Sequence, residues 1–246
     1  MNTEQVIQEV VFKDLGHIDY REAWDYQEKL LKENVEVKAA VRGGAGNPPE
    51  ESLRPQLATR NYLLFCEHPP VYTLGKSGHQ DNLLINDQQL AQKGIQFVQT
   101  NRGGDITFHG PEQIVGYPIL DLEKFFTDIG KYLRSLEEVI ILTLGEYGIK
   151  GSRSPGETGV WIEPELPRKA RKICAMGVRC SRWITMHGFA LNVNTDLNYF
   201  NYIIPCGIAG KQVTSMEKEL GHTVQMEEVK EKIKRNFAKV FGMDFI

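Results

Sequence analysis

The feature that most constrains the fold of this chain is the irregular order in which strand-type and helix-type hydrophobic patterns follow one another. Alternating or continuously apolar stretches predict strands at residues 6–12, 61–67, 71–74, 95–98, 113–120, 159–162, 171–183 and 184–193. Helical periodicity predicts helices at residues 20–33, 87–93, 127–146 and 226–241, with a helical turn at 197–202. These elements mix without a strict βαβ alternation and without an internal repeat, which predicts an α/β (α+β) domain built on a mixed β-sheet.

The length of the chain favours one domain. A domain typically has roughly 100–200 residues, so the 246 residues, 1–246, are interpreted as a single domain. After the helix at 20–33 the apolar periodicity stops, and the sequence Arg-Gly-Gly-Ala-Gly-Asn-Pro-Pro-Glu-Glu occupies residues 42–51. Because glycine and proline punctuate loops, we expect a mobile surface insertion at about 35–60.

Charge and cysteine content exclude several classes of protein. Lys plus Arg number 29 and Asp plus Glu number 32, so the net charge of −3 is too balanced for a general nucleic-acid or membrane-surface binder. The first residues lack the apolar run of a secretory signal, and no stretch approaches the roughly 18 apolar residues of a membrane span. We therefore expect a cytoplasmic protein with neither nucleic-acid nor membrane partners. The four cysteines form no CxxC pair, so no metal site is predicted.

A glycine-rich segment in the middle of the chain concentrates polar side chains. Residues 102–111 read Arg-Gly-Gly-Asp-Ile-Thr-Phe-His-Gly-Pro and are predicted to form a loop. Adjacent glycines let a backbone approach a ligand closely, and the Arg, Thr and His side chains add donors, which suits a carbonyl or phosphate group. A plain turn between strands is an equally good interpretation of these residue types. The segment matches neither a P-loop nor GxGxxG, so nucleotide binding is not predicted.

Three further side chains are candidates for chemistry. Cys206 lies in a Pro-Cys-Gly sequence that can hold a thiol rigidly, although a thiol becomes a nucleophile only beside a cation, a histidine or a helix N-terminus. Lys172 begins an alternating strand and is either a solvated edge charge or an inward ammonium that stabilises a thiolate. His187 is either a ligand-binding or a hydrogen-bonded structural histidine. The remaining cysteines are interpreted as buried apolar residues: Cys66, Cys174 and Cys180.

Taken together, these segments resemble one known family. The similarity lies in residues 102–122, in Lys-Ile-Cys-Ala-Met-Gly-Val-Arg at 172–179, in His-Gly-Phe-Ala-Leu-Asn-Val at 187–193 and in Pro-Cys-Gly at 205–207. Glu-His-Pro-Pro-Val-Tyr-Thr-Leu-Gly at 67–75 agrees as well. The chain strongly resembles the octanoyltransferase (lipoate-protein ligase B) family in these motifs, which cover most of the chain from about 61 to 210. The resemblance implies a single domain of the biotin/lipoate protein ligase type, with a bent mixed β-sheet flanked by helices.

The resemblance also implies an activity and its residues. Members of this family are acyltransferases that move an octanoyl group from octanoyl-acyl carrier protein to a lysine of lipoyl domains, the first step of endogenous protein lipoylation, without a cofactor. The implied acceptors are the lipoyl domains of 2-oxoacid dehydrogenase complexes and the glycine cleavage H protein. Cys206 resembles the catalytic nucleophile that carries the acyl group as a thioester, and Lys172 resembles the residue that lowers its pKa. Residues similar to the family's substrate pocket are Arg102, Gly103, Gly104, Asp105, Ile106, Thr107, Phe108, His109, Ala175, Met176, Gly177, Gly188, Phe189 and Ala190.

Two expectations concern the chemistry within this pocket. The acceptor lysine must lose a proton, which Lys172 or, as the second choice, His109 receives. The octanoyl tail is expected to lie along the small residues at 175, 177, 188 and 190. Gly177→Leu is therefore predicted to block acyl transfer while leaving the fold intact.

The sequence departs from the family in two places, and three other functions are considered. Glu112 stands where the family usually has glycine, which leaves the conformation of this loop open, and residues 35–60 are longer than in typical members. An ATP-dependent lipoate or biotin ligase of the same fold would need no cysteine. A non-catalytic acyl- or cofactor-binding module would bind octanoyl groups reversibly without forming a covalent adduct. A hydrolytic cysteine enzyme is disfavoured because Cys206 lacks an obvious His-Asn/Asp constellation.

Overall fold

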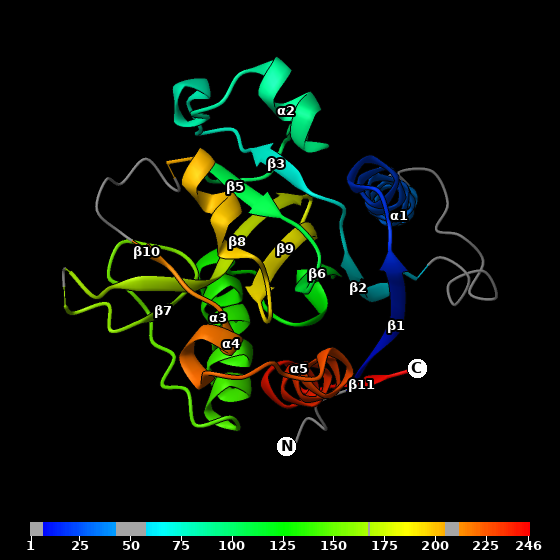
Figure 1. The fold of residues 1–246 in the computed structure, drawn as a ribbon. Coiled ribbons are helices and arrows are strands. Elements are labelled where there is room, and N and C mark those ends of the chain that lie inside the picture. The colour runs from blue at the N-terminus through cyan, green and yellow to red at the C-terminus, as the bar shows by residue number, and fades with distance from the viewer. Residues whose placement is uncertain (1–6, 43–57, 167, 205–211) are drawn as a thin grey trace.

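The centre of the computed structural model, which describes residues 7–42, 58–166, 168–204 and 212–246, is an eight-stranded mixed sheet (Figure 1). Its order is β10-β8-β9-β6-β2-β1-β11, and β7 pairs with β8. The strands are β1 (Gln8–His17), β2 (Asn61–Glu67), β6 (Gln113–Ile119), β7 (Val160–Ile162), β8 (Arg171–Ser181), β9 (Ile184–Asn192), β10 (Gln212–Val213) and β11 (Met243–Phe245). A three-stranded sheet of order β4-β3-β5 consists of β3 (Val71–Leu74), β4 (Gln96–Gln99) and β5 (Ile106–His109). Both sheets contain parallel and antiparallel pairs, which confirms the predicted mixed sheet.

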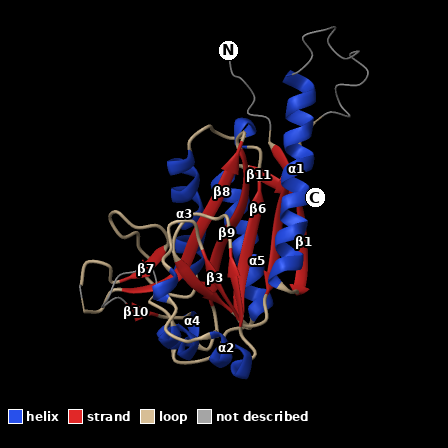
Figure 2. Ribbon diagram, turned by 90° about the horizontal axis from the view of Figure 1, so that it is seen from above, coloured by secondary structure: helices blue, strands red, loops and turns tan. Residues whose placement is uncertain are grey.

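Helices cover both faces of the large sheet (Figure 2). The helices of the described residues are α1 (Tyr20–Arg42), α2 (Asp87–Lys93), α3 (Ile129–Gly145), α4 (Met216–Leu220) and α5 (Met226–Phe241), with short 3₁₀ helices η2 (Gln80–Asn82), η3 (Leu122–Lys124) and η4 (Leu197–Tyr202). On one face Leu30 of α1 belongs to the same buried cluster as Met186 of β9. On the other face Leu136 of α3 and Ile233 of α5 cluster with Phe189 of β9. The domain therefore has a helix–sheet–helix arrangement with a core on each side.

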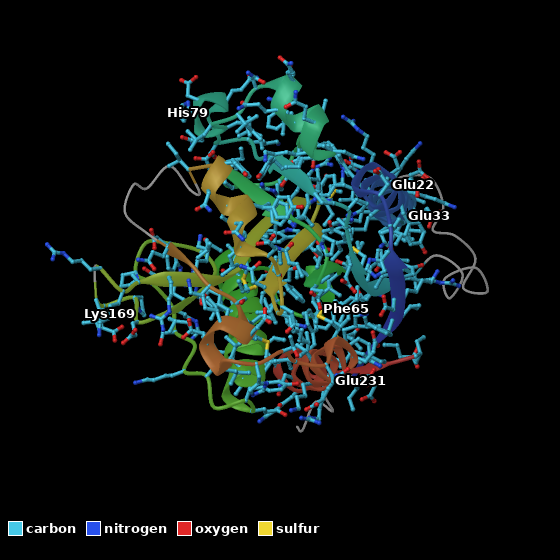
Figure 3. The ribbon with its side chains drawn as sticks, in the orientation of Figure 1. Glu22, Glu33, Phe65, His79, Lys169 and Glu231 are labelled. Atoms are coloured by element: carbon cyan, nitrogen blue, oxygen red, sulfur yellow. The ribbon has the colours of Figure 1, made fainter. Side chains whose placement is uncertain are left out.

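Side chains sort between core and surface as the apolar patterns predict. Phe65 of β2 points inward and packs edge-on against Phe189, with the ring centroids 6.2 Å apart. The charged side chains of Glu33, Lys169 and Glu231 are exposed on the periphery (Figure 3). The stripe of apolar residues that predicted a helix at 226–241 lies on the buried side of α5, whose observed bounds are the predicted ones.

The expected insertion at about 35–60 is wrong in its first part. Residues 35–42 continue α1, although the apolar periodicity ends earlier. Val35 packs against the core on this face, and the buried ammonium of Lys38 pairs with the carboxylates of Asp121 and Glu123. Buried ion pairs carry no hydrophobic periodicity, which explains why the apolar pattern did not predict these last turns of the helix. Residues 43–57 lie outside the described residues.

One strand was mistaken for part of a loop. Residues 106–109, placed in the glycine-rich loop by the sequence analysis, form β5, which pairs antiparallel with β3 from Val71↔His109 to Leu74↔Ile106. Four residues between glycines are too short to establish an alternation. The short strands β10 and β11 and the helix α4 were not predicted for the same reason.

No helix within the described ranges is both long enough and apolar enough to cross a membrane.

Candidate functional site

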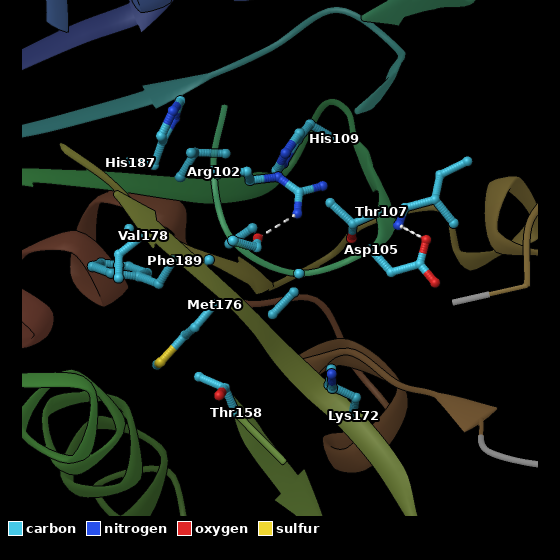
Figure 4. A pocket seen from close by; sticks show the side chains of 18 of the residues that line it. Arg102, Asp105, Thr107, His109, Thr158, Lys172, Met176, Val178, His187 and Phe189 are labelled. Carbon is cyan, nitrogen blue, oxygen red and sulfur yellow. Dashed lines mark hydrogen bonds between the residues drawn. The ribbon is translucent and has the colours of Figure 1, made fainter. Parts of the chain in front are cut away.

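A cavity of about 580 Å³ opens between the segment that precedes and includes β5 and the strands β8 and β9 (Figure 4). All but one of the predicted substrate-pocket residues line it, and Lys172 lines it too. The lining members of that set are Arg102, Gly103, Gly104, Asp105, Ile106, Thr107, His109, Ala175, Met176, Gly177, Gly188, Phe189 and Ala190. The structure thus brings residues from three separate sequence motifs around one cavity, while their role in binding stays a prediction.

Phe108 is the exception, and its place in the pocket is corrected. Its ring stacks on Tyr199 with the centroids 4.5 Å apart, and it contacts Tyr72 and Phe200 in the cluster under the small sheet. Successive side chains of a strand point to opposite faces, so Phe108 points away from the cavity that Thr107 and His109 line.

The cavity reaches both faces of β8. Figure 4 shows Arg102 and His109 on one side of this strand and Met176 and Thr158 on the other. This is possible because β7 pairs with β8 only as far as Cys174. The segment before β5 contacts the remaining edge of β8, since the Gly103 N–H donates to the carbonyl of Val178 at 3.0 Å.

Arg102 is a buried cation that ties this segment to β3. Its Nη2 donates to the carbonyl of Thr73 at 2.6 Å and to Thr73 Oγ1 at 2.9 Å, and its Nη1 donates to the carbonyl of Gly103 at 3.1 Å. Gly75 shows how closely the backbones approach, because a Cβ there would lie 2.2 Å from the carbonyl oxygen of Gly104. The positive charge is therefore fixed at the cavity wall.

His109 is held as a neutral imidazole by its neighbours. Gln113 donates its amide N–H to Asn192 Oδ1 at 2.8 Å, so its Oε1 accepts from His109 Nδ1 at 2.8 Å. The other ring nitrogen faces Thr73 Oγ1 at 3.3 Å. Burial, with the charge effects of His68 and Arg102, holds the pKa of His109 well below its usual value. With both nitrogens occupied, His109 is poorly suited to be the general base, which had been the second choice for that role.

Lys172 is fixed through its backbone from both sides. Its carbonyl accepts from the Thr214 N–H at 2.9 Å, and Asn192 Nδ2 donates to the carbonyl of Thr214 at 3.0 Å. On the opposite side Lys172 pairs with Trp161 of β7. Its Nζ lies 4.6 Å from the centroid of the Trp161 ring. Lys172 therefore does not lie on a free sheet edge, because β10 and β7 pair with it on either side, and it lines the cavity.

His187 combines both interpretations that the sequence left open. Its Nε2 donates to Asn101 Oδ1 at 2.7 Å, an assignment that follows because Asn101 Nδ2 donates to Glu28. It also lines the cavity. Its φ of 57° turns the side chain out of the alternation of β9 and toward Trp24 of α1. Burial lowers the pKa of His187 to about 3, so it is a neutral, hydrogen-bonded histidine.

Two glycines of the wall are required by the backbone rather than by a ligand. A Cβ at Gly177 would lie 2.6 Å from the carbonyl oxygen of Gly103, and one at Gly188 would lie 2.2 Å from that of Gly116. The expectation that Gly177→Leu leaves the fold intact is therefore corrected, because any side chain there must displace the Arg102–Gly103 segment.

Glu112 shows how the chain tolerates a residue where glycine is usual. Its φ is 59°, in the left-handed region that favours glycine. Its N–H donates to Glu67 Oε2 at 2.7 Å, and its carbonyl accepts from the Asn194 N–H at 3.1 Å and from Thr195 Oγ1 at 3.0 Å. These bonds hold the loop in a left-handed conformation despite the side chain.

The candidate nucleophile, Cys206, lies outside the described residues. The flanking residues are fixed, since the Ile204 N–H donates to the Asn82 carbonyl at 2.8 Å and the Gln212 N–H to the Ala170 carbonyl at 3.3 Å. Cys66 and Cys174 are buried, and burial raises the pKa of each thiol. These two therefore behave as the expected buried apolar residues.

Several cavity residues were not anticipated from the sequence. The most informative are Tyr20, Gln113, Tyr117 and Asn192. Gln113 and Asn192 are polar residues at the ends of apolar strands, and a buried amide needs partners, which was the available signal. Among the described residues, no group of three or more His, Cys, Asp or Glu side chains is arranged to hold a metal ion.

Comparison with known proteins adds to this geometry. The family model "Lipoyl protein ligase A/B catalytic domain" matches residues 19–238. An octanoyltransferase of Christiangramia forsetii is 60% identical over 95% of this chain and 96% of its own, and one of Flavobacterium psychrophilum is 60% identical over 96% and 98%. Among solved structures, a lipoate-protein ligase A bound with ATP has a TM-score of 0.65 at 14% identity, covering 98% of this chain and 87% of its own. A bipartite lipoate protein ligase from Thermoplasma acidophilum has a TM-score of 0.64 at 16% identity, covering 97% and 85%. The structural similarities show that the fold is that of lipoate protein ligases.

Proposed function

This chain belongs to the octanoyltransferase family, whose shared unit is the lipoyl protein ligase A/B catalytic domain, and on that premise we propose how its residues carry out the transfer. The protein is an octanoyltransferase enzyme. The donor is octanoyl-acyl carrier protein, and the acceptors are lysines of lipoyl domains, including those of 2-oxoacid dehydrogenase complexes and the glycine cleavage H protein. The chain acts as a single catalytic domain, and its cytoplasmic location stays a prediction.

Acyl transfer proceeds in two steps through Cys206. The Lys172 ammonium stabilises the Cys206 thiolate, which attacks the thioester carbonyl of the donor. The carbon–sulfur bond to the carrier breaks, and the departing thiolate takes a proton from Lys172. An octanoyl-cysteine thioester and a neutral Lys172 remain.

The second step restores both groups. The acceptor lysine, as a neutral amine, attacks the thioester, the carbon–sulfur bond to Cys206 breaks and an amide forms. Lys172 takes the proton that the amine loses, so the ammonium–thiolate pair is regenerated. Exchange of a thioester for an amide is downhill, so the proposal requires neither ATP nor a metal.

The observation that carries this proposal is the attachment of Lys172 to the strand that follows Cys206. Val213 of β10 pairs with Lys172 in the sheet, and Gln212 pairs with Arg171. Cys206 is six residues before Gln212 and two after the anchored Ile204. Chain connectivity therefore limits how far the thiol can be from the ammonium, since each residue spans at most about 3.6 Å.

The cavity supports an acyl substrate. Its volume of about 580 Å³ is within the usual range for small-ligand sites, roughly 300–1,000 Å³, and apolar and small side chains share its wall with fixed donors. Burying each CH₂ contributes about 0.8 kcal/mol, so an eight-carbon chain gains substantial binding energy there.

Intact-protein mass spectrometry after mixing with octanoyl-acyl carrier protein tests the proposal. We expect a hydroxylamine-labile octanoyl adduct on the wild type and on Lys169→Ala, which alters an exposed lysine near Lys172. The adduct is expected to be absent from Cys206→Ser and strongly reduced in Lys172→Ala.

Octanoylation of a lipoyl domain by an enzyme that never forms the adduct would refute the role of Cys206. Activity of Cys206→Ala with octanoic acid and ATP would instead establish the ligase alternative. Reversible octanoyl binding without transfer would establish the binding-module alternative.

A further inference from the structure

Two groups border the side chain of Lys172: the ring of Trp161 in β7 and the backbone of Gly159 just before β7. The indole ring of Trp161 lies under the ammonium, with Nζ 4.6 Å from the ring centroid. On the stem side, a Cβ placed on Gly159 would lie 3.6 Å from Lys172 Cε. The ammonium is thus bounded by an aromatic face and by a glycine backbone.

The position of Trp161 is strongly determined. Its Cα is the direct partner of the Lys172 Cα in the antiparallel β7–β8 pair, and a register shift separates it from Val160. On the other edge of β7 the Trp161 backbone makes two hydrogen bonds with Ser152. The Ser152 N–H donates to the Trp161 carbonyl at 2.8 Å, and the Trp161 N–H donates to the Ser152 carbonyl at 2.9 Å. Only 2% of the residue is exposed, so the packed side chains around it restrict the ring.

The Gly159 backbone is fixed by a buried carboxylate. The Gly159 N–H donates to Glu137 Oε1 at 3.0 Å, and its φ is 113°. The Glu137 side chain is fully buried and pairs with Arg134 at 2.8 Å and Arg153 at 3.2 Å. A side chain at position 159 would collide with the Cys174 carbonyl at 2.5 Å, so only glycine fits beside the lysine stem.

We propose that Trp161 is a positioning residue for acyl transfer, whose ring holds the Lys172 ammonium by a cation–π contact where it can stabilise the Cys206 thiolate. The ring attracts the ammonium through its quadrupole and attracts a neutral amine far less. The contact therefore favours the charged resting form and weakens when Lys172 gives up its proton. This inference rests on the proposed Cys206–Lys172 chemistry.

Other ionisable groups near Lys172 come from several elements. Arg171 of β8 is paired with Glu163 and with Glu219 of α4, and Glu137 of α3 is paired with two arginines. The ionisable groups that share the cavity wall with Lys172 are Arg102, Asp105, His109, Glu157, His187, Tyr20 and Tyr117. Substitution of Trp161 alters none of these ionisable groups, so a changed pH dependence of the reaction is attributed to loss of the Trp161 ring.

The test measures the rate of Cys206 alkylation by iodoacetamide against pH, and the rate of octanoyl-adduct formation. Cys206→Ser gives the background from the remaining cysteines. We expect Trp161→Leu to slow adduct formation about five-fold at neutral pH and to move the alkylation midpoint upward by about half a pH unit. Trp161→Phe, which keeps a weaker aromatic face, is expected to lie between Leu and the wild type. A purely structural role would not produce this order together with a shifted midpoint.

A second series removes the risk that Trp161→Leu fails to fold. Fluorinated tryptophans keep the shape of the ring but weaken its negative face, and the same incorporation into Trp161→Phe controls for the other two tryptophans. We expect adduct formation to slow in steps with the number of fluorines, only when Trp161 is present. Equal rates across this series would overturn the role of Trp161. If Lys172→Ala itself formed the adduct at the wild-type rate, the Cys206–Lys172 proposal would fail instead.

Discussion

Adding a single methyl group at Gly177 is expected to disturb both the stability and the activity of the enzyme. In Gly177→Ala the new Cβ would lie 2.6 Å from the Gly103 carbonyl oxygen and 3.2 Å from Arg102 Cδ. The first contact is roughly 1 Å inside the separation of about 3.5 Å at which such atoms attract best. The segment that carries Arg102 must therefore move away from β8.

The size of the effect follows from what this movement breaks. The Gly103 N–H would lose or lengthen its 3.0 Å hydrogen bond to the Val178 carbonyl, a bond worth about 1 kcal/mol. Overpacking in a well-filled site costs about 1–3 kcal/mol, and a surface segment can yield, so we expect the free energy of unfolding to fall by about 1–2 kcal/mol. Displacement of the cavity wall by even part of an ångström is expected to lower kcat/KM about 10- to 100-fold.

Urea unfolding and steady-state octanoyl transfer measure the two effects on the same preparation. Gly145→Ala is the matched control, because a Cβ in this last turn of α3 meets no atom within 4 Å. Alanine is the better helix former, so this variant is expected to gain about 0.5 kcal/mol and to keep full activity. A Gly177→Ala variant as stable and as active as the wild type would show that the Arg102–Gly103 segment is not displaced.

Three other predictions concern residues away from the reacting groups. Phe108→Leu is expected to lower the free energy of unfolding by about 1–2 kcal/mol, because the side chain is buried and stacked, and to leave the acyl chain-length preference unchanged. A changed preference would indicate that Phe108 contacts the acyl chain. Glu112→Gly is expected to raise the free energy of unfolding by about 0.5–1 kcal/mol because φ is 59°, and Glu112→Ala to lower it, a difference that urea titration resolves. Burial lowers the pKa of His68 to about 4 and that of His187 to about 3, so the unfolded chain binds more protons below pH 6.5. The stability they contribute is complete above about pH 6.5 and is lost toward pH 4, by up to about 1.4 kcal/mol per pH unit for each histidine; equal urea midpoints at pH 7.5 and pH 5 would contradict this.

The long, strongly periodic elements could all be predicted from the sequence, whereas several short or polar ones could not. The apolar stripe through Ile233 and Phe237 predicted α5 correctly, because apolar residues that repeat at helical spacing over four turns fit only an amphipathic helix. The last turns of α1 could not be predicted because a polar residue, Lys38, is buried there and held by ion pairs, so no periodic apolar pattern marks the buried side of the helix. β5 escaped because its pairing partner β3 is remote in sequence, and the pairing rather than the local pattern makes it a strand.

The wall of the cavity shows the same division. Glycines and donors in residues 102–111 indicated a close approach of backbone to ligand, and that segment does line the cavity. The direction of a side chain was harder to predict where the backbone leaves the regular alternation. His187 pairs with Val178 across the β8–β9 ladder, yet its left-handed backbone turns the ring toward Trp24. The aromatic face beside Lys172 depends on the register of β7 with β8, which no local sequence pattern sets.

The parallel pairing of β11 with β1 has a consequence for how this enzyme is made. Residues 8–10 of β1 pair with residues 243–245 of the edge strand β11, and Ile233 and Phe237 of α5 complete the core around Phe65. While it is being synthesised, the nascent chain cannot close this core, and the apolar face of the sheet awaits residues 226–245. Pairings between such distant segments form slowly, so the core is expected to close only after residues 226–245 have been synthesised and to depend on protection from aggregation until then.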